Sequence, residues 1–260
     1  WVQAVVATGA LMTHGFVEGA GMLHFKHRQS MKDEDLFERG YNRVYDTIEL
    51  EKNLDDAVVL LDAVLSEIEP GTTISSHHLL SQVGHMLDRN DVGRAILRSA
   101  VQKEVPIYVP AFTDSELGLD FAIHNRKLRE AGKTPFPFDP FLDLEDFADR
   151  VREHENLGIF TIGGGVPRNW AQQIAPYLEI TANRLGTGEA VHRYRYAVRI
   201  CPEPEHWGGL SGCSYTEGVS WGKFVPESEG GRHAEVHADA TIAWPIIVRA
   251  VIERLEARPK

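Results

Sequence analysis

Short apolar segments alternate with longer amphipathic segments along this chain, and this alternation is the feature that most limits its possible folds. Residues 55–68 illustrate the longer kind, because Leu61, Val64 and Leu65 recur there at helical spacing. Residues 157–162 illustrate the shorter kind, an apolar run that leads into three glycines. Strands that alternate with helices favour an α/β protein whose parallel sheet is covered by helices.

The expected elements are assigned from these patterns. We expect strands over residues 2–7, 106–109, 157–162, 194–200 and 234–238. We expect helices over residues 55–68, 79–87, 92–101, 142–154 and 242–255. Loops are expected over residues 133–140 and 202–212, which are rich in Pro and Gly. No convincing linker interrupts the chain, so we expect a single domain over residues 1–260. The chain opens as a strand without an initiator Met, and we expect that a segment is missing upstream.

Composition and charge argue against several classes of protein. The formal net charge is −11, so the chain lacks the excess of cations with which proteins neutralise nucleic-acid phosphates. No apolar run reaches the roughly 18 residues that a membrane-spanning helix needs. The chain has only two cysteines, Cys201 and Cys213, and no signal peptide, so we expect a cytoplasmic protein. Its 12 histidines form no recognised metal-binding motif, so no metal site is expected.

Small and polar residues come directly after four of the expected strands. They are Thr8-Gly9-Ala10, Asp114, the Gly run at residues 163–165, and Asp239-Ala240. Ligands of open α/β sheets bind outside the carboxyl ends of the strands, so these clusters predict one shared crevice. The Gly run allows either a pyrophosphate at a helix N-terminus or a plain tight turn. Asp239 allows either a ribose contact or a helix N-cap.

A second candidate region surrounds a lysine near residue 220. Ser214 and Glu217 have the spacing of a capping box, which would account for Glu217 without any function. Gly222 can end that short helix, and Lys223 comes directly after it. Lys223 beside the indole of Trp221 would be partly desolvated, which lowers the pKa of an amine and makes it a usable nucleophile. The plain alternative is a solvated surface lysine.

Residues 210–224 (LSGCSYTEGVSWGKF) resemble the signature of deoxyhypusine synthases, in which a Glu precedes Ser-Trp-Gly-Lys. Further segments match in that family's order, namely residues 40–44, 105–114, 162–166 and 238–240. The resemblance implies a Rossmann-like α/β fold, with a mostly parallel sheet and helices on both faces. It also implies a homotetramer with active sites at subunit interfaces.

The same resemblance implies the chemistry. The cofactor is NAD, and the donor is a polyamine such as spermidine. A 4-aminobutyl group passes through a lysine imine to an acceptor amine, which is a protein lysine in the parent activity. Lys223 matches the imine-forming lysine and Glu217 joins it as a catalytic residue, while Glu217 and Trp221 match polyamine-contacting positions. The NAD-contacting positions correspond to Thr8, Gly9, Ala10, Asp114, Gly165, Asp239 and Ala240.

Departures from the family fall in the polyamine pocket. Thr13-His14 stands where the family has a Glu pair, Trp170 where it has a His, and Leu210 where it has an acid. Asp120 is a displaced acid. We therefore assign His14, Trp170 and Asp120 to substrate binding, and the pattern resembles the bacterial deoxyhypusine-synthase-like branch. Two alternatives stay open: a homospermidine-synthase-like enzyme that uses putrescine or agmatine, and a non-catalytic homologue that binds NAD.

Overall fold

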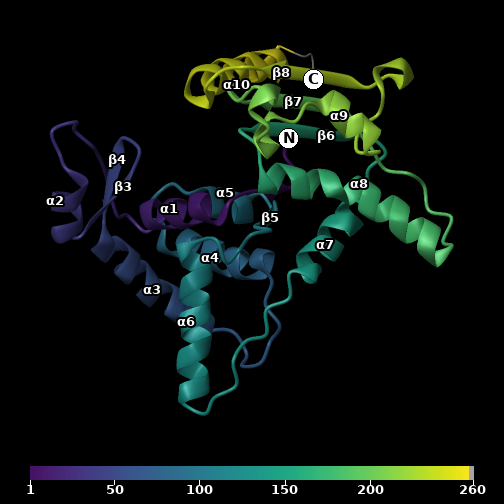
Figure 1. The fold of residues 1–260 in the computed structure, drawn as a ribbon. Helices are drawn as coiled ribbons and strands as arrows, with labels where there is room; N and C mark the ends of the chain where they lie inside the picture. Colours follow the sequence, from purple (N-terminus) through teal and green to yellow (C-terminus); the bar gives the residue numbers. More distant parts are fainter. Residues whose placement is uncertain (258–260) are drawn as a thin grey trace. The chain divides into compact units, whose positions relative to one another are not determined.

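The computed structural model describes residues 1–257. They divide into two compact units, Trp1–Asp143 and a second unit that begins at Leu144 (Figure 1). Residues 258–260, the last three of the predicted domain, lie outside the described residues. That residues 1–260 act as one domain stays a prediction. Among the helices that the structure describes, none has both the length and the apolar character needed to cross a bilayer.

Unit 1, Trp1–Asp143, contains two small sheets and most of the helices. Strand β1 (Val5–Val6) pairs in parallel with β5 (Ile107–Tyr108). An antiparallel sheet has the strand order β2-β4-β3, with β2 at His24–Lys26, β4 at Thr47–Leu50 and β3 at Tyr41–Val44. The helices are α1 (Gly9–Gly19), α2 (Asp33–Glu38), α3 (Glu51–Ser66), α4 (Ser76–Asn90), α5 (Ile96–Gln102) and α6 (Glu116–Glu130), and α7 (Phe141–Arg152) begins at its end.

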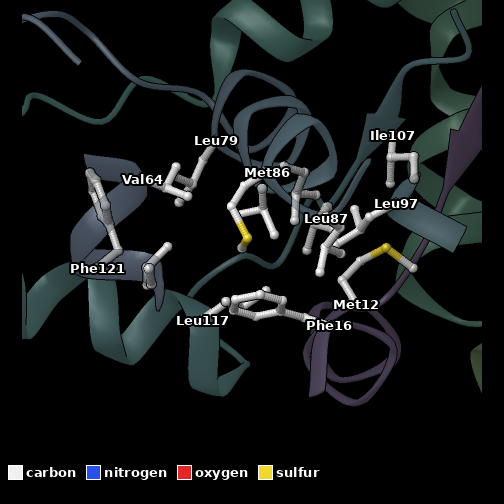
Figure 2. Packing of buried hydrophobic residues seen from close by; sticks show 14 of the residues in the cluster. Met12, Phe16, Val64, Leu79, Met86, Leu87, Leu97, Ile107, Leu117 and Phe121 are labelled. Carbon is white, nitrogen blue, oxygen red and sulfur yellow. The ribbon is translucent and has the colours of Figure 1, made fainter. Parts of the chain in front are cut away.

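The core of unit 1 is formed by the apolar faces of its helices. Met12 and Phe16 of α1 meet Leu87 of α4 and Leu117 of α6 in one continuous cluster (Figure 2). Phe16 is fully buried. Each of these side chains contributes on the order of 1.5–3 kcal/mol by leaving water. The cluster therefore fixes α1 and α6, the two helices that come after β1 and β5.

Unit 2, which begins at Leu144, is built on a three-stranded parallel sheet with the order β6-β7-β8 (Figure 1). The strands are β6 (Leu157–Ile162), β7 (Tyr194–Ile200) and β8 (Arg232–Val236). The helices are α8 (Val166–Leu185), α9 (Tyr215–Ser220) and α10 (Ala240–Glu256), with 3-10 turns η1 (Glu205–Trp207), η2 (Leu210–Gly212) and η3 (Glu227–Glu229).

Helices pack on both faces of this sheet. Successive residues of a strand point to opposite faces. Phe160 of β6 packs edge to face against Trp244 of α10, with ring centroids 5.0 Å apart. The next residue, Thr161, accepts a 3.4 Å hydrogen bond from the hydroxyl of Tyr215 at the start of α9. The parallel α/β fold expected from the sequence is therefore confirmed.

Most expected elements are present, and a few have different bounds. β6 and β7 keep the predicted bounds, whereas β1 and β5 are shorter than predicted because each has only two paired residues. The predicted helix over residues 92–101 begins only at Ile96. The strand predicted over residues 234–238 is β8, which lies two residues earlier. Its polar start, Arg232 and His233, is paired with β7. The antiparallel sheet of β2, β3 and β4 was not predicted.

Candidate functional site

The helix α9, which leads to the candidate lysine, begins at a defined cap in unit 2. The Ser214 side chain accepts a hydrogen bond from the backbone N–H of Glu217 at 3.2 Å, as the predicted capping box requires. The backbone N–H of Tyr215, the first residue of α9, donates to Glu235 of β8 at 2.9 Å. The start of α9 is thus tied to the sheet as well as to its own cap.

The end of α9 is closed by a Schellman motif, which determines where Lys223 leaves the helix. The N–H of Gly222 donates to the carbonyl of Val219 at 3.0 Å, and the N–H of Lys223 donates to that of Gly218 at 3.1 Å. Gly222 has a φ of +70°, a conformation that side chains disfavour. Gly218 is also required, since a Cβ there would lie 2.6 Å from the ring of Phe224.

Beyond the helix, the backbone around Lys223 pairs with the first residue of β7. The carbonyl of Lys223 accepts from the N–H of Tyr194 at 3.0 Å, and the N–H of Val225 donates to the carbonyl of Tyr194 at 2.9 Å. The backbone of Lys223 is therefore held on one side by α9 and on the other by the sheet. Its side chain starts from a fixed position.

The Lys223 amine is buried and bonded to a neutral partner. Only 8% of Lys223 is exposed, and its Nζ donates to Oδ1 of Asn169 on α8 at 2.9 Å. Burial lowers the pKa of Lys223 below the ordinary lysine value, and the positive charge of Arg168 lowers it further. A larger fraction of this amine is therefore neutral, and thus nucleophilic, than in a solvated lysine.

Two buried arginines hold the loop that leads into α9. Arg168 donates to the carbonyls of Leu210 at 2.6 Å and Cys213 at 2.8 Å. Arg199 of β7 donates to the carbonyls of Ser211 at 2.6 Å and Cys213 at 2.8 Å, and it forms an ion pair with Glu235. Burial lowers the pKa of Arg168, whose charge lies close to Lys223. Arg168 therefore both holds the loop and places a positive charge near the lysine.

The predicted Gly run lies at the carboxyl end of β6 and opens the long helix α8. The N–H of Gly163 donates to the carbonyl of Ile200 at 2.7 Å, which fixes the turn to β7. Gly165 is the N-cap of α8 and has a φ of +103°. A Cβ on Gly165 would meet no other atom within 4 Å, so the space beside this residue is open. Backbone N–H groups at a helix N-terminus favour an anionic group.

Asp239 lies just after β8, at the same carboxyl edge of the sheet. Its Oδ1 accepts from the backbone N–H of Thr241 at 2.8 Å and from the Thr241 hydroxyl at 2.6 Å. These bonds lower the pKa of Asp239, which keeps it ionised at neutral pH. The N-cap alternative is confirmed, and Ala240 is the first residue of α10. A contact of Asp239 with a ribose stays a prediction.

The aromatic and acidic residues predicted to contact a polyamine differ in exposure and in the contacts that they make. Glu217 is exposed on α9, and Trp221 is 67% exposed, so the indole does not enclose Lys223. Trp170 stacks on Phe147 with centroids 5.3 Å apart. The neighbour of Trp170, Asn169, makes the observed bond to the lysine.

The remaining predicted site residues belong to unit 1. Thr8 caps α1 by accepting from the N–H of Leu11 at 3.3 Å. Gly9 packs so closely on Ser115 that a Cβ would lie 2.3 Å from the Ser115 Cβ. Ala10 is the second residue of α1, so it lies at the same helix start as Thr8 and Gly9.

Three further predicted residues of unit 1 are Asp114, Asp120 and His14. Asp114 is exposed and lies beside Ser115, the N-cap of α6. Asp120 is buried in α6, with 8% exposed, and Nδ1 of His14 on α1 shares a 2.9 Å hydrogen bond with Glu49. Their assignment to cofactor and substrate stays a prediction.

The sequence pattern did not single out three residues that shape the lysine site. Asn169 accepts a hydrogen bond from the Lys223 amine, and Arg168 places a positive charge near that amine. Arg199 holds the loop that precedes α9. Arg168 stands where a G-x-G-x-x-G motif beginning at Gly163 would have its last Gly, and Arg199 occurs inside an apolar strand. An arginine inside a strand that is otherwise buried is the signal that could have been used, because buried charges need dedicated partners.

The fold and the site together define a class: an α/β protein with a desolvated lysine beside a Gly-rich strand end. The family model for deoxyhypusine synthase matches residues 1–251. The chain therefore belongs to the deoxyhypusine synthase family.

Individual relatives carry related names. "Probable deoxyhypusine synthase 2" of Methanosarcina acetivorans is 34% identical over 254 residues, 97% of this chain and 69% of that protein. "Probable deoxyhypusine synthase 2" of Archaeoglobus fulgidus is 33% identical over 254 residues, 97% of this chain and 78% of that protein. "Deoxyhypusine synthase-like protein" of Chlorobaculum parvum is 33% identical over 251 residues, 95% of this chain and 67% of that protein. The family thus includes both archaeal and bacterial relatives of this chain.

Proposed function

We propose that this protein is an NAD-dependent aminoalkyl transferase that moves a 4-aminobutyl group from a polyamine, through an imine on Lys223, to an acceptor amine. The observation that carries this proposal is the state of Lys223. Its amine is buried, hydrogen-bonded to Asn169 and close to the charge of Arg168. Membership of the deoxyhypusine synthase family supports the same chemistry.

In the proposed reaction, one amine replaces another at a carbon atom that remains part of an imine, first Lys223 and then the acceptor. The lone pair of Nζ attacks the imine carbon of the oxidised donor, and the bond from that carbon to the departing amine breaks. A proton from Nζ leaves with the departing amine, so charge and atoms balance. The acceptor amine then displaces Lys223 in the same way. The reaction needs a neutral Nζ, which the surroundings of Lys223 favour.

The residues at the strand ends of unit 2 fit a dinucleotide. The space beside Gly165, the N-cap of α8, is open, and a pyrophosphate at this helix N-terminus would be stabilised by backbone N–H groups and the helix dipole. Asp239 offers a carboxylate at the same sheet edge. When bound, NAD would accept a hydride from the donor and return it to the product, so the transfer is redox-neutral overall. Thr8, Gly9, Ala10, Asp114 and Ala240 are the further proposed contacts.

Glu217 and Trp221 are the proposed contacts for the ammonium groups of the polyamine. Both are exposed, so both are available to a ligand or to a second subunit. A carboxylate attracts an ammonium group by charge, and an indole face attracts it through its π electrons. The proposed assembly is a homotetramer in which neighbouring subunits complete the site.

Product analysis tests the proposed function. The full chain is incubated with NAD and a panel of amines that includes spermidine, putrescine and agmatine, and the products are identified by mass spectrometry. We expect a new secondary amine that carries a 4-aminobutyl group, and no such product from Lys223→Ala or Lys223→Arg. A product that persists in both variants would show that transfer does not pass through this lysine.

A further inference from the structure

Three side chains from separate elements of unit 1 meet around one buried carboxylate. Glu49 of β4 has a side chain that is only 4% exposed. Its Oε2 lies 2.9 Å from Nδ1 of His14 on α1 and 3.2 Å from Nε2 of His24 on β2. The two imidazole rings lie edge to face with centroids 5.4 Å apart. Ligand atoms of all three residues lie within 4.8 Å of one another.

Two atoms in this cluster are buried and poorly paired. Oε1 of Glu49 has no hydrogen-bond partner among residues 1–257, and the one contact given for Nε2 of His24 is the 3.2 Å approach to Oε2 of Glu49. Buried polar atoms are nearly always paired, because an unpaired one costs about 1–3 kcal/mol. Both atoms belong to the cluster of His14, His24 and Glu49. A cation at this point would satisfy both.

The opposite nitrogen of His24 is also held in the way that metal ligands require. Nδ1 of His24 lies 3.0 Å from Oε1 of Glu18, which is 58% exposed. A histidine that binds a metal through one nitrogen usually donates its other N–H to a carboxylate or carbonyl. The bond to Glu18 therefore favours the tautomer in which Nε2 carries a lone pair.

We propose that His14, His24 and Glu49 bind a divalent transition-metal ion, best matched by Zn²⁺. Two histidines and one glutamate form a ligand set that zinc uses with a fourth, open position. Ligands about 2.0–2.1 Å from a tetrahedral zinc lie roughly 3.3 Å apart, and the two measured separations, 2.9 and 3.2 Å, are close to that value. Small shifts of these side chains would therefore admit the ion.

Such an ion would cross-link three elements of unit 1. The ligands come from the middle of α1 and from two strands of the antiparallel sheet. This proposal departs from the expectation of no metal drawn from the sequence. His14 and His24 are ten residues apart, and Glu49 follows 25 residues later. This spacing matches no compact motif, so no local pattern indicates the site. The proposal does not rest on transfer through Lys223, but it gives His14, which the sequence assigns to substrate binding, a different role.

A zinc titration of the full chain tests the proposal. The metal-free protein competes with a chromophoric chelator for Zn²⁺, and the chelator's colour reports the amount bound. We expect one equivalent of zinc per chain. His24→Asn and Glu49→Gln should each weaken binding by at least about tenfold, and Glu18→Gln by about tenfold through loss of the bond that orients His24. Circular dichroism checks that each variant is folded.

His154→Asn is the matched control, because His154 is exposed on unit 2 and lies outside the cluster. It should bind zinc as the parent chain does. If His24→Asn fails to fold, Glu18→Gln still decides, since Glu18 is largely exposed. The proposal is overturned if the parent chain binds no zinc. It is also overturned if the folded cluster variants bind as tightly as the parent, or if His154→Asn loses as much affinity as they do.

Discussion

Lys223 sits among groups that disfavour its positive charge. Burial removes water from the ammonium form, and Arg168 repels it, while Asn169 offers a carbonyl oxygen that either form can use. The opposing effects of Cys213 and Glu217 are smaller. The neutral form is thus favoured by the position of the residue.

We predict that the pH at which Lys223 becomes reactive is lower than for an ordinary lysine. Since the folded pKa is depressed, the neutral amine is populated at a pH below the usual value of about 10.4. The measurement is reductive alkylation with a small aldehyde across a pH series, read for each lysine by peptide mass spectrometry. Exposed Lys133 serves as the reference for the reagent itself. A midpoint for Lys223 at or above the usual value would contradict the prediction.

Asp120 is a second residue whose charge the fold disfavours. Burial raises the pKa of its carboxyl to about 6, and the negative charge of Glu116 contributes in the same direction. The unfolded chain would titrate near about 3.9. Because the folded pKa is the higher one, the group stabilises the fold fully below about pH 4, and that contribution is lost as the pH rises through about 6.

Relative to the parent, Asp120→Asn should therefore make unit 1 more stable at neutral pH than it does at acid pH. We expect the difference in the free energy of unfolding, variant minus parent, to rise by about 1–3 kcal/mol between about pH 4 and pH 7. Urea unfolding at the two pH values measures it. The control is Asp35→Asn, at an exposed position of α2. A difference that does not change with pH would show that Asp120 is not protonated in the fold.

At the scale of the element, the end of α9 determines the position of Lys223. Its last turn ends at Gly222 in a left-handed conformation, and the Schellman bonds from Gly222 and Lys223 set the direction of the chain. Gly186, at the end of α8, adopts a similar φ of +66° and has open space around it. The two glycines are alike in backbone, but only Gly222 directly precedes the candidate lysine.

Gly222→Ala and Gly186→Ala should lower stability alike but affect Lys223 differently. Each places a side chain in the left-handed region, at a cost of about 1–2 kcal/mol. We expect Gly222→Ala to slow alkylation of Lys223 by about tenfold or more, since small misplacements of a reactive group have large effects on rate. Gly186→Ala should leave that rate unchanged. Equal rates in the two variants would mean that the Schellman motif does not position the lysine.

Strands and caps differ in how far the sequence predicts them. β6 and β7 are apolar runs, and both have the predicted bounds. β8 was predicted two residues late because its first residues are polar. Glu235, which lies inside the predicted range, forms an ion pair with buried Arg199 on the neighbouring strand, a long-range contact that no local pattern contains.

The antiparallel sheet was missed for a related reason. Its strands have three or four residues each, and β2 and β3 are mostly exposed, so they lack the apolar runs that identify strands. β3 and β4 are joined by a two-residue turn in which Tyr45 has a φ of +55°, without the Asn-Gly or Asp-Gly signal of such turns. The cluster of His14, His24 and Glu49 could not be predicted without this sheet.

At the scale of the whole molecule, the predicted site residues are distributed over both units. Thr8, Gly9, Ala10 and Asp114 belong to unit 1, while Gly165, Asp239 and Ala240 belong to unit 2. Within each unit these residues come after strands and begin or precede helices, as the sequence predicted. That they form one crevice stays a prediction.

The resemblance to deoxyhypusine synthases reached further than any single motif. It predicted the family, which the match over residues 1–251 confirms, and it singled out Lys223. It drew attention to Trp170, whereas the side chain bonded to the lysine is that of the preceding residue, Asn169. A difference of one residue on a helix rotates a side chain by about 100°, and only the structure resolves it.

The most direct measurement is borohydride trapping of the proposed imine. The full chain is incubated with NAD and spermidine, reduced with borohydride and digested, and the peptide that contains Lys223 is weighed. We predict the added mass of a 4-aminobutyl group on Lys223, dependent on NAD and on the donor amine. If product forms while this peptide stays unmodified, or if the adduct lies on another lysine, Lys223 is not the group that carries the transfer.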